Sequence, residues 1–184
     1  MLKRGFDVLL SGLGLVLFSP LIVVLILFAS IDTRSNGVFI QKRIGKDGRV
    51  FILYKLRTMK GISEKISKIG FLLRKYKMDE ILQLFNVFIG DMSFVGPRPD
   101  IPGYADKLEG EDRLILNLKP GITGPASLKY YNEEELLSQA EDPLKYNDEV
   151  IYPDKVKINL EYYYNRSFWG DIIIIINTIF RTNY

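Results

Sequence analysis

The chain has 184 residues, which suits one domain or a compact domain with an appended segment. It contains no cysteine and no histidine, which excludes disulfide bonds, thiolate nucleophiles, Ser-His-Asp triads and the usual zinc sites. Its net charge of +3 is unevenly distributed, because residues 1–78 carry +11 and residues 79–184 carry −8. Any catalysis would use carboxylates, Lys, Arg, Tyr or Ser, or an oxygen-bound cation such as Mg²⁺.

The basic N-terminal part of the chain contains a long apolar segment. This combination indicates an anionic membrane surface or a phosphate-bearing substrate. Nucleic acid is the other common partner of clustered basic charge. The sequence contains no groove-reading motif, so we expect no nucleic acid partner.

The apolar segment runs from Val8 to Ile31, 24 residues without a charged side chain. As one helix it would be about 36 Å long, enough to cross a bilayer core of roughly 30 Å. Ser19-Pro20 lies near its middle, and a sharp kink is expected there because proline removes a helical hydrogen bond. The Ser19 hydroxyl can help satisfy the carbonyls that are freed. The plainest interpretation is a kinked spanning helix.

Basic residues flank this segment on both sides, with Lys3 and Arg4 before it and Arg34 shortly after it. Basic flanks prefer the cytoplasmic side of a membrane. A spanning helix would place one flank outside, whereas a hairpin bent at Ser19-Pro20 keeps both inside. We therefore predict that both flanks face the cytoplasm.

Two β-rich runs follow, Val38–Ile44 and Val50–Lys55, separated by Gly45-Lys46-Asp47-Gly48. The glycine-containing connection predicts a small β-hairpin. Basic residues then lead to an adjacent pair of carboxylates, and on pattern alone they could simply be solvated. They are Lys55, Arg57, Lys60, Arg74, Lys75 and Lys77.

The pair of carboxylates, Asp79 and Glu80, opens a predicted helix in which Asp79, Gln83 and Asn86 share one face. We expect this helix to stop at Gly90. Acidic residues in a first helical turn often do no more than complement the helix dipole.

Beyond this helix, Gly96-Pro97-Arg98-Pro99 holds an arginine between two prolines. Each proline restricts the residue before it, so Arg98 is expected on stiff backbone. A Pro-x-Pro segment is often only a rigid bend. Carboxylates at a helix start facing a rigid arginine nevertheless suit a site for a metal ion and a phosphate.

The whole string MDEILQLFNVFIGDMSFVGPRP, Met78–Pro99, closely resembles the signature of the bacterial sugar transferases, the small monotopic phosphoglycosyl transferases. In that signature an Asp-Glu dyad opens a helix that is followed by GDMS and VGPRP. The resemblance extends from KRGFD at Lys3–Asp7 to the last predicted helix.

The resemblance implies an enzyme that transfers a phospho-sugar from a UDP-sugar to polyprenol (undecaprenyl) phosphate. The products would be polyprenol-diphosphate-sugar and UMP, in the first membrane step of surface-glycan or glycoprotein assembly. Asp79 would attack the sugar-linked phosphorus to form an acyl-phosphate intermediate. Mg²⁺ would be held by Asp79 and Glu80, and Glu80 would complete the metal site or handle a proton.

The resemblance also implies substrate contacts. Arg98 and Arg74 would grip phosphate oxygens, with Lys55, Gly96 and Pro97 beside them at motif positions. Two other functions stay open: a hydrolase of membrane-bound phosphate esters that uses the same dyad, and a non-catalytic membrane-surface adaptor that keeps the fold.

Farther along, Tyr104–Leu118 reads as a polar, solvated helical stretch. Pro120–Pro125 reads as a tight loop with two positions free for positive φ, and it resembles the family's PGITG loop. The family's usual continuation of this loop is missing here, and Lys129 could replace the missing cation.

The C-terminal part contains acidic and aromatic segments. Glu133–Glu135 predicts an exposed acidic helix, and Glu141-Asp142 predicts an exposed acidic loop. Tyr162–Tyr164 and Trp169 suit either a membrane interface or an ordinary core. Ile172–Ile176 is too short to span a bilayer, so an interfacial or core helix is expected. Asn159 stands where many relatives carry aspartate, and we assign it no catalytic role.

The predicted fold is an α/β, mostly helical monotopic membrane protein. Residues 1–33 would form a re-entrant helix-break-helix hairpin, as the resemblance favours. Residues 34–184 would form a catalytic domain on the cytoplasmic face of the bacterial inner membrane, in contact with the inner leaflet. This domain would contain amphipathic surface helices and a small β-hairpin. A homo-oligomer is left open.

Overall fold

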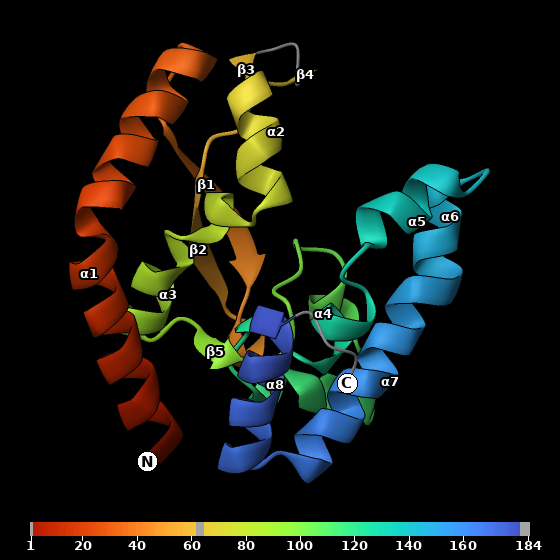
Figure 1. The fold of residues 1–184 in the computed structure, drawn as a ribbon. Coiled ribbons are helices and arrows are strands. Elements are labelled where there is room, and N and C mark those ends of the chain that lie inside the picture. Colours follow the sequence, from red (N-terminus) through yellow and green to blue (C-terminus); the bar gives the residue numbers. More distant parts are fainter. Residues whose placement is uncertain (1, 62–64, 181–184) are drawn as a thin grey trace. The chain divides into compact units, whose positions relative to one another are not determined.

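The computed structural model describes residues 2–61 and 65–180 (Figure 1). The chain forms two compact units. The first contains residues 1–43 and 50–92, and the second contains residues 44–49 and 93–184. Helices dominate both units, and the described strands pair only in two-stranded sheets. The mostly helical α/β class with small sheets is confirmed.

The first helix, α1 (Leu2–Thr33), is continuous through Pro20. In a regular helix the N–H of residue 20 would bond to the Val16 carbonyl, and proline has no N–H. Ser19 Oγ instead donates to Val16 O at 2.8 Å, so that carbonyl keeps a partner. The helix Leu2–Thr33 is thus not broken at Ser19-Pro20, contrary to the prediction. The prediction that the serine hydroxyl helps satisfy a freed carbonyl is confirmed.

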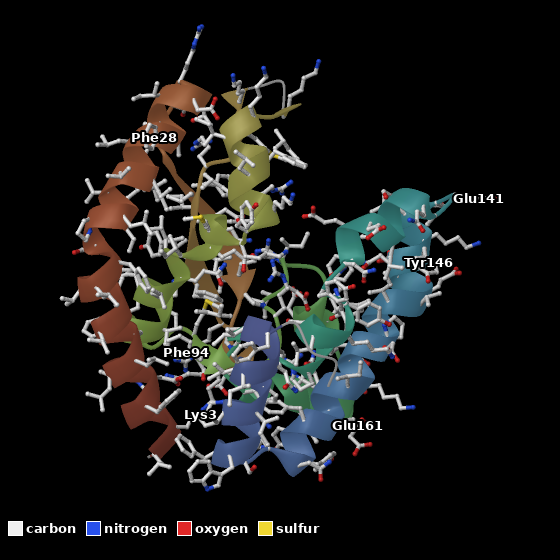
Figure 2. All side chains as sticks on the ribbon, in the orientation of Figure 1. Lys3, Phe28, Phe94, Glu141, Tyr146 and Glu161 are labelled. Carbon is white, nitrogen blue, oxygen red and sulfur yellow. The ribbon has the colours of Figure 1, made fainter. Side chains whose placement is uncertain are left out.

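By length and composition α1 is long and apolar enough to cross a membrane. Most of its apolar side chains are exposed, including Phe28, which is labelled in Figure 2. Its re-entrant course stays a prediction.

One face of α1 packs on α3 (Gln83–Ile89). A Cβ added at Gly12 or Gly14 would lie 3.3 Å from the side chain of Phe88 or Leu84, so the glycines allow close approach of the two helices. Arg4 donates to Val87 O and Phe88 O, carbonyls in the last turn of α3. The helix α1 thus belongs to the same compact unit as residues 50–92. The functional division at residues 33 and 34 stays a prediction.

The predicted β-hairpin is present as β1 (Val38–Ile44) and β2 (Val50–Leu56). The connection contains the 3-10 helix η1 (Lys46–Gly48), in which Asp47 and Gly48 have φ values of 60° and 74°. Short strands β3 (Met59–Lys60) and β4 (Lys65–Ile66) pair antiparallel.

The predicted helix at Asp79 has two parts. After α2 (Lys68–Lys75), the 3-10 helix η3 (Met78–Glu80) precedes α3. A tighter 3-10 turn is common at a helix start because it satisfies backbone groups near the end. The helix ends as predicted at Gly90, whose φ of 101° gives a left-handed cap.

The second unit contains one parallel strand pair, β5 (Ser93–Val95) and β6 (Gly121–Thr123), in register Ser93 with Gly121. Besides η1, its helices are η4 (Ala105–Lys107), η5 (Asp112–Asn117), α4 (Pro125–Lys129), α5 (Glu133–Gln139), α6 (Pro143–Tyr146), η6 (Asn147–Ile151, a π-helix), α7 (Tyr152–Asn165) and α8 (Phe168–Phe180).

The prediction for Pro120–Pro125 is wrong in its conformation. Gly121 lies in strand β6, and Gly124 is extended with φ 178°. These glycines serve close packing instead, since a Cβ at Gly121 would lie 2.2 Å from Gly96 N and one at Gly124 would lie 2.3 Å from Gly96 O.

The stretch Tyr104–Leu118 is also different from its prediction. It forms two short 3-10 helices, η4 and η5, rather than one solvated helix. Its residues Ala105 and Leu116 are buried against Ile44, because they pack in a small apolar core of the second unit.

The C-terminal helices agree more closely with what the sequence predicts. The acidic helix α5 has no buried residue, and Glu141 lies exposed between α5 and α6 (Figure 2). Tyr162 is buried and donates to Asp171 Oδ1 at 2.5 Å, which ties α7 to α8. Trp169, in contrast, is 74% exposed, so the aromatic residues divide between core and surface.

Candidate active site

Asp79 lies in η3, in the first compact unit, directly after a turn. Lys77 before it has left-handed backbone, with φ 56°. The Asp79 side chain is buried, and its Oδ1 accepts no hydrogen bond from the residues that the structure describes. A buried carboxylate oxygen without a partner is costly, which makes it a candidate for contact with a ligand.

The surroundings of Asp79 shift its protonation. Burial, followed by the neighbouring charge of Glu80, raises the pKa of the Asp79 carboxyl above its ordinary value of 3.8. The positive charges of Lys55, Arg74 and Lys77 oppose this rise. The carboxylate therefore lies in a poorly solvated place that three cations surround, which suits an encounter with an anionic phosphate.

Glu80 has a different environment from its neighbour. Its Oε1 lies 3.0 Å from Lys55 Nζ, at the end of β2, and both side chains are largely buried. An ion pair protected from water is screened much less than one on the surface. Lys55, predicted from the sequence to bind phosphate, thus also pairs with the second carboxylate of the dyad.

The structure brings four predicted site residues together in the first unit: Asp79, Glu80, Lys55 and Arg74. Arg74 lies in the last turn of α2, a position that favours a cation near the helix carboxyl end. The sequence placed Lys77 only among general basic residues. Its left-handed turn just before the dyad is not visible in the residue pattern.

The shared face of Asp79, Gln83 and Asn86 is confirmed. All three side chains are buried, with 8%, 2% and 0% of their surface exposed. A buried polar face on a short helix is unusual and indicates a specific role. The sequence identified this face but not the contacts of Asn86.

Gly96, Pro97 and Arg98 belong to the second unit. Gly96 N donates to Thr123 O at 2.9 Å, and Gly121 N donates to Pro97 O at 2.8 Å. These bonds hold the VGPRP segment against the segment that resembles PGITG. Gly96 and Pro97 therefore have a structural role in this unit, and Arg98 is exposed. A contact of these three residues with phosphate stays a prediction.

Lys129 forms an ion pair with Asp154, with Lys129 Nζ 2.7 Å from Asp154 Oδ2, and its ammonium lies over the Tyr130 ring. Tyr130 OH donates to the same Asp154 oxygen. These contacts connect α4 to α7. Lys129 has a structural partner, and its proposed use as a replacement cation is untested.

The dyad fits Mg²⁺ by its donor atoms. The unpartnered Oδ1 of Asp79 and the adjacent Glu80 carboxylate supply hard oxygen ligands. No cluster of three or more acidic side chains that could hold a metal occurs in residues 2–61 and 65–180. Mg²⁺ is commonly held by one or two carboxylates together with substrate phosphates and water, so two carboxylates are compatible with such a site. Binding of Mg²⁺ at the dyad stays a prediction.

Comparison with known proteins places these features in a wider group. A family model described as "Bacterial sugar transferase" matches residues 1–183. A UDP-N-acetylgalactosamine-undecaprenyl-phosphate N-acetylgalactosaminephosphotransferase of Aeromonas hydrophila is 31% identical, over 97% of this chain and 43% of the relative. A UDP-glucose:undecaprenyl-phosphate glucose-1-phosphate transferase of Escherichia coli is 32% identical, over 98% of this chain and 40% of the relative.

The chain therefore spans less than half the length of these two relatives. It covers most of a third, the exopolysaccharide production protein ExoY of Rhizobium meliloti, which is 28% identical over 97% of this chain and 84% of the relative.

Proposed function

Because this chain belongs to the bacterial sugar transferase family, we propose that it transfers a phospho-sugar from a UDP-sugar to polyprenol phosphate. The names of two relatives each specify a UDP-sugar as donor, undecaprenyl phosphate as acceptor and a sugar phosphate as the group transferred. These names support this choice of substrates. The products are polyprenol-diphosphate-sugar and UMP. The observation that carries the proposal is the buried Asp79, with an unpartnered oxygen among three cations.

The reaction has two displacement steps at one phosphorus atom. In the first, a carboxylate oxygen of Asp79 forms a bond to the phosphorus that bears the sugar, and the bond from that phosphorus to UMP breaks. In the second, an oxygen of polyprenol phosphate attacks the same phosphorus, and the bond to Asp79 breaks. Asp79 leaves the cycle as the carboxylate that began it.

The residues of the first unit favour these steps electrostatically. The ammonium of Lys55 and the guanidinium of Arg74 lower the cost of bringing a diphosphate next to a carboxylate. Burial of Asp79 removes water that would compete with the phosphorus for its oxygen. The ion pair with Lys55 holds Glu80 in place beside the nucleophile.

Mg²⁺, held when bound by Asp79 and Glu80, supplies charge neutralisation for an anion that approaches an anion. Glu80, which is paired with Lys55, would complete the metal site or handle a proton. Arg98, with Gly96 and Pro97, is the proposed phosphate-binding segment of the second unit.

We place the protein at the cytoplasmic face of the bacterial inner membrane, where UDP-sugars are found, with α1 inserted in the inner leaflet. The apolar, mostly exposed surface of α1 supports insertion. The basic residues on both flanks support a course that enters and leaves on one side.

The test is a panel of UDP-sugars incubated with undecaprenyl phosphate and Mg²⁺ in detergent, with UMP as the readout. We expect UMP and a lipid-linked sugar diphosphate to form in equal amounts with at least one donor. Free sugar phosphate formed without lipid acceptor would instead indicate a hydrolase. Full biological activity of an Asp79→Asn variant in cells would indicate a non-catalytic adaptor.

A further inference from the structure

A side chain, rather than a third strand, binds one edge of β2. Asn86 Oδ1 accepts a hydrogen bond from Tyr54 N at 3.1 Å, and Asn86 Nδ2 donates to Ile52 O at 2.6 Å. In a strand, the C=O of one residue and the N–H of the second residue after it point to the same edge. The amide of Asn86 therefore makes the two bonds that the main chain of a neighbouring strand would make.

Asn86 is also fixed from its own side. Its side chain is fully buried, and its main-chain oxygen accepts from Gly90 N and Met92 N, both at 3.1 Å. One residue thus joins β2, helix α3 and the loop that follows α3. Buried hydrogen bonds of this kind are rigid, because leaving either partner unpaired away from water is unfavourable.

Strand β2 carries Lys55, the residue directly after Tyr54. Its ammonium must reach Glu80, which lies 25 residues later in η3, and the distance between the two charged atoms is 3.0 Å. A displacement of β2 by about one ångström that the Lys55 side chain did not compensate would take this pair beyond hydrogen-bond distance. Misplacement on that scale near a reacting group can reduce turnover about a hundredfold.

We propose that Asn86 is a positioning residue for the dyad. Its amide fixes β2 against α3 so that Lys55 meets Glu80, beside Asp79. The inference rests on the proposed function in one respect, because it takes the dyad as the catalytic group.

The kinetic test compares Asn86→Ala in two backgrounds, wild type and Lys55→Met, with UMP formation as the readout. We expect Asn86→Ala to lower kcat by about tenfold to a hundredfold in the wild type. In the Lys55→Met background we expect it to add less than about twofold, because the contact through which Asn86 acts is already absent. Equal fold-losses in the two backgrounds would overturn the proposal.

Val87→Ala is the matched control. Val87 is the next residue on α3 and is also fully buried, but its apolar side chain makes no hydrogen bond to β2. We expect Val87→Ala to lower Tm with little loss of kcat at temperatures below unfolding. Its effect should be the same with and without Lys55→Met.

A second readout is independent of turnover. Lys55 is shielded by its ion pair, so a water-soluble amine-acylating reagent should modify it slowly, and peptide mass spectrometry measures the rate. Asn86→Ala should increase labelling of Lys55 several-fold relative to Lys60, whereas Val87→Ala should not. Unchanged Lys55 labelling in Asn86→Ala would refute the inference even if the wild type made no UMP. Absence of UMP from the wild type counts against the proposed function alone.

If Asn86→Ala does not fold, Asn86→Asp takes its place in both measurements. Aspartate keeps the volume and the acceptor for Tyr54 N but removes the donor to Ile52 O. Asn86→Asp should likewise lower kcat more in the wild type than in the Lys55→Met background and increase labelling of Lys55. Equal fold-losses or unchanged labelling would overturn the proposal.

Discussion

Lys55 Nζ lies 3.0 Å from Glu80 Oε1, so the lysine pairs with the second carboxylate of the dyad. The first carboxylate, Asp79, has an Oδ1 that accepts no hydrogen bond from the described residues. The two adjacent carboxylates consequently differ in environment. Glu80 is held by an ion pair, whereas Asp79 is buried with a raised pKa. Such a division between neighbouring carboxylates is typical of sites in which one group reacts and the other supports it.

The first prediction concerns the nucleophile. Asp79→Asn keeps the shape of the side chain but removes the reacting charge, so UMP formation should fall about a thousandfold or more. Wild-type enzyme incubated with the UDP-sugar alone should gain the mass of one phospho-sugar on the peptide that contains Asp79.

The control for this experiment is Asp91→Asn, on a partly exposed carboxylate in the turn after α3. It should retain activity and form the adduct. If sensitive mass spectrometry finds no adduct on wild-type enzyme and turnover requires both substrates bound together, the covalent mechanism is wrong.

The second prediction links the same substitution to stability. A raised pKa means that folded Asp79 binds its proton more tightly than the unfolded chain does, so ionisation at neutral pH disfavours the folded state. Asp79→Asn should therefore raise Tm at pH 7 in metal-free buffer. The gain should shrink as pH falls through the raised pKa and vanish below the ordinary value of 3.8, where both states are protonated.

Glu80→Gln should have the opposite effect, lowering Tm at pH 7, because it removes the partner of a largely buried lysine. Thermal unfolding of the three proteins from pH 7 to below pH 3.8 gives the comparison. A lower Tm for Asp79→Asn than for wild type at pH 7 would show that ionised Asp79 stabilises the fold.

The third prediction concerns Arg98. Lysine keeps the positive charge but loses the planar pair of donors, so Arg98→Lys should lower kcat/KM by about tenfold or more if the arginine binds phosphate with two hydrogen bonds. Arg49→Lys is the control, since Arg49 is also exposed and belongs to the same unit. Equal activity of the two variants would reduce Arg98 to part of a rigid bend.

The fourth prediction concerns Gly96, whose added Cβ would lie 2.2 Å from Lys119 O. Backbone cannot move away as a flexible side chain can, so Gly96→Ala should separate β5 from β6 and cost about 2 kcal/mol or more of stability. Tm measured by circular dichroism tests this. Gly5→Ala should leave Tm unchanged or slightly raised, because a Cβ there meets nothing within 4 Å and alanine favours helix.

The fifth prediction concerns the course of α1. The chain has no cysteine, so Leu2→Cys and Asn36→Cys, both on exposed residues, can be probed with a membrane-impermeant thiol reagent. Both should be shielded in intact cells and labelled after permeabilisation. Labelling of position 2 alone from outside would show that α1 spans the membrane.

A change at the proline tests the same point from the other direction. Replacing Ser19 and Pro20 together with leucine restores the missing N–H and removes the hydroxyl that bonds Val16 O. If the re-entrant course depends on the missing N–H of Pro20, the double variant should form a spanning helix and expose one flank. An unchanged labelling pattern would show that Ser19 and Pro20 do not determine the course of α1.

The sequence by itself determined the features that depend on local chemistry. The strand Val38–Ile44, the end of α3 at Gly90 and the shared face of Asp79 and Asn86 all follow from side-chain period and turn residues. The dyad itself was visible in the same way, as adjacent carboxylates at a helix start. These features need only a few neighbouring residues, so a residue pattern is sufficient to predict them.

Only the tertiary structure decided which of those elements contact one another. The pairing of Lys55 with Glu80 spans 25 residues, and the bonds of Asn86 to β2 span more than 30. Gly121, expected to serve a turn, instead allows a close approach to Gly96. Burial, ion pairing and backbone contact depend on which distant segments meet, and burial raises the pKa of the Asp79 carboxyl. The residue pattern identifies Asp79 as the candidate nucleophile, and the packing of distant segments determines how far that residue is buried.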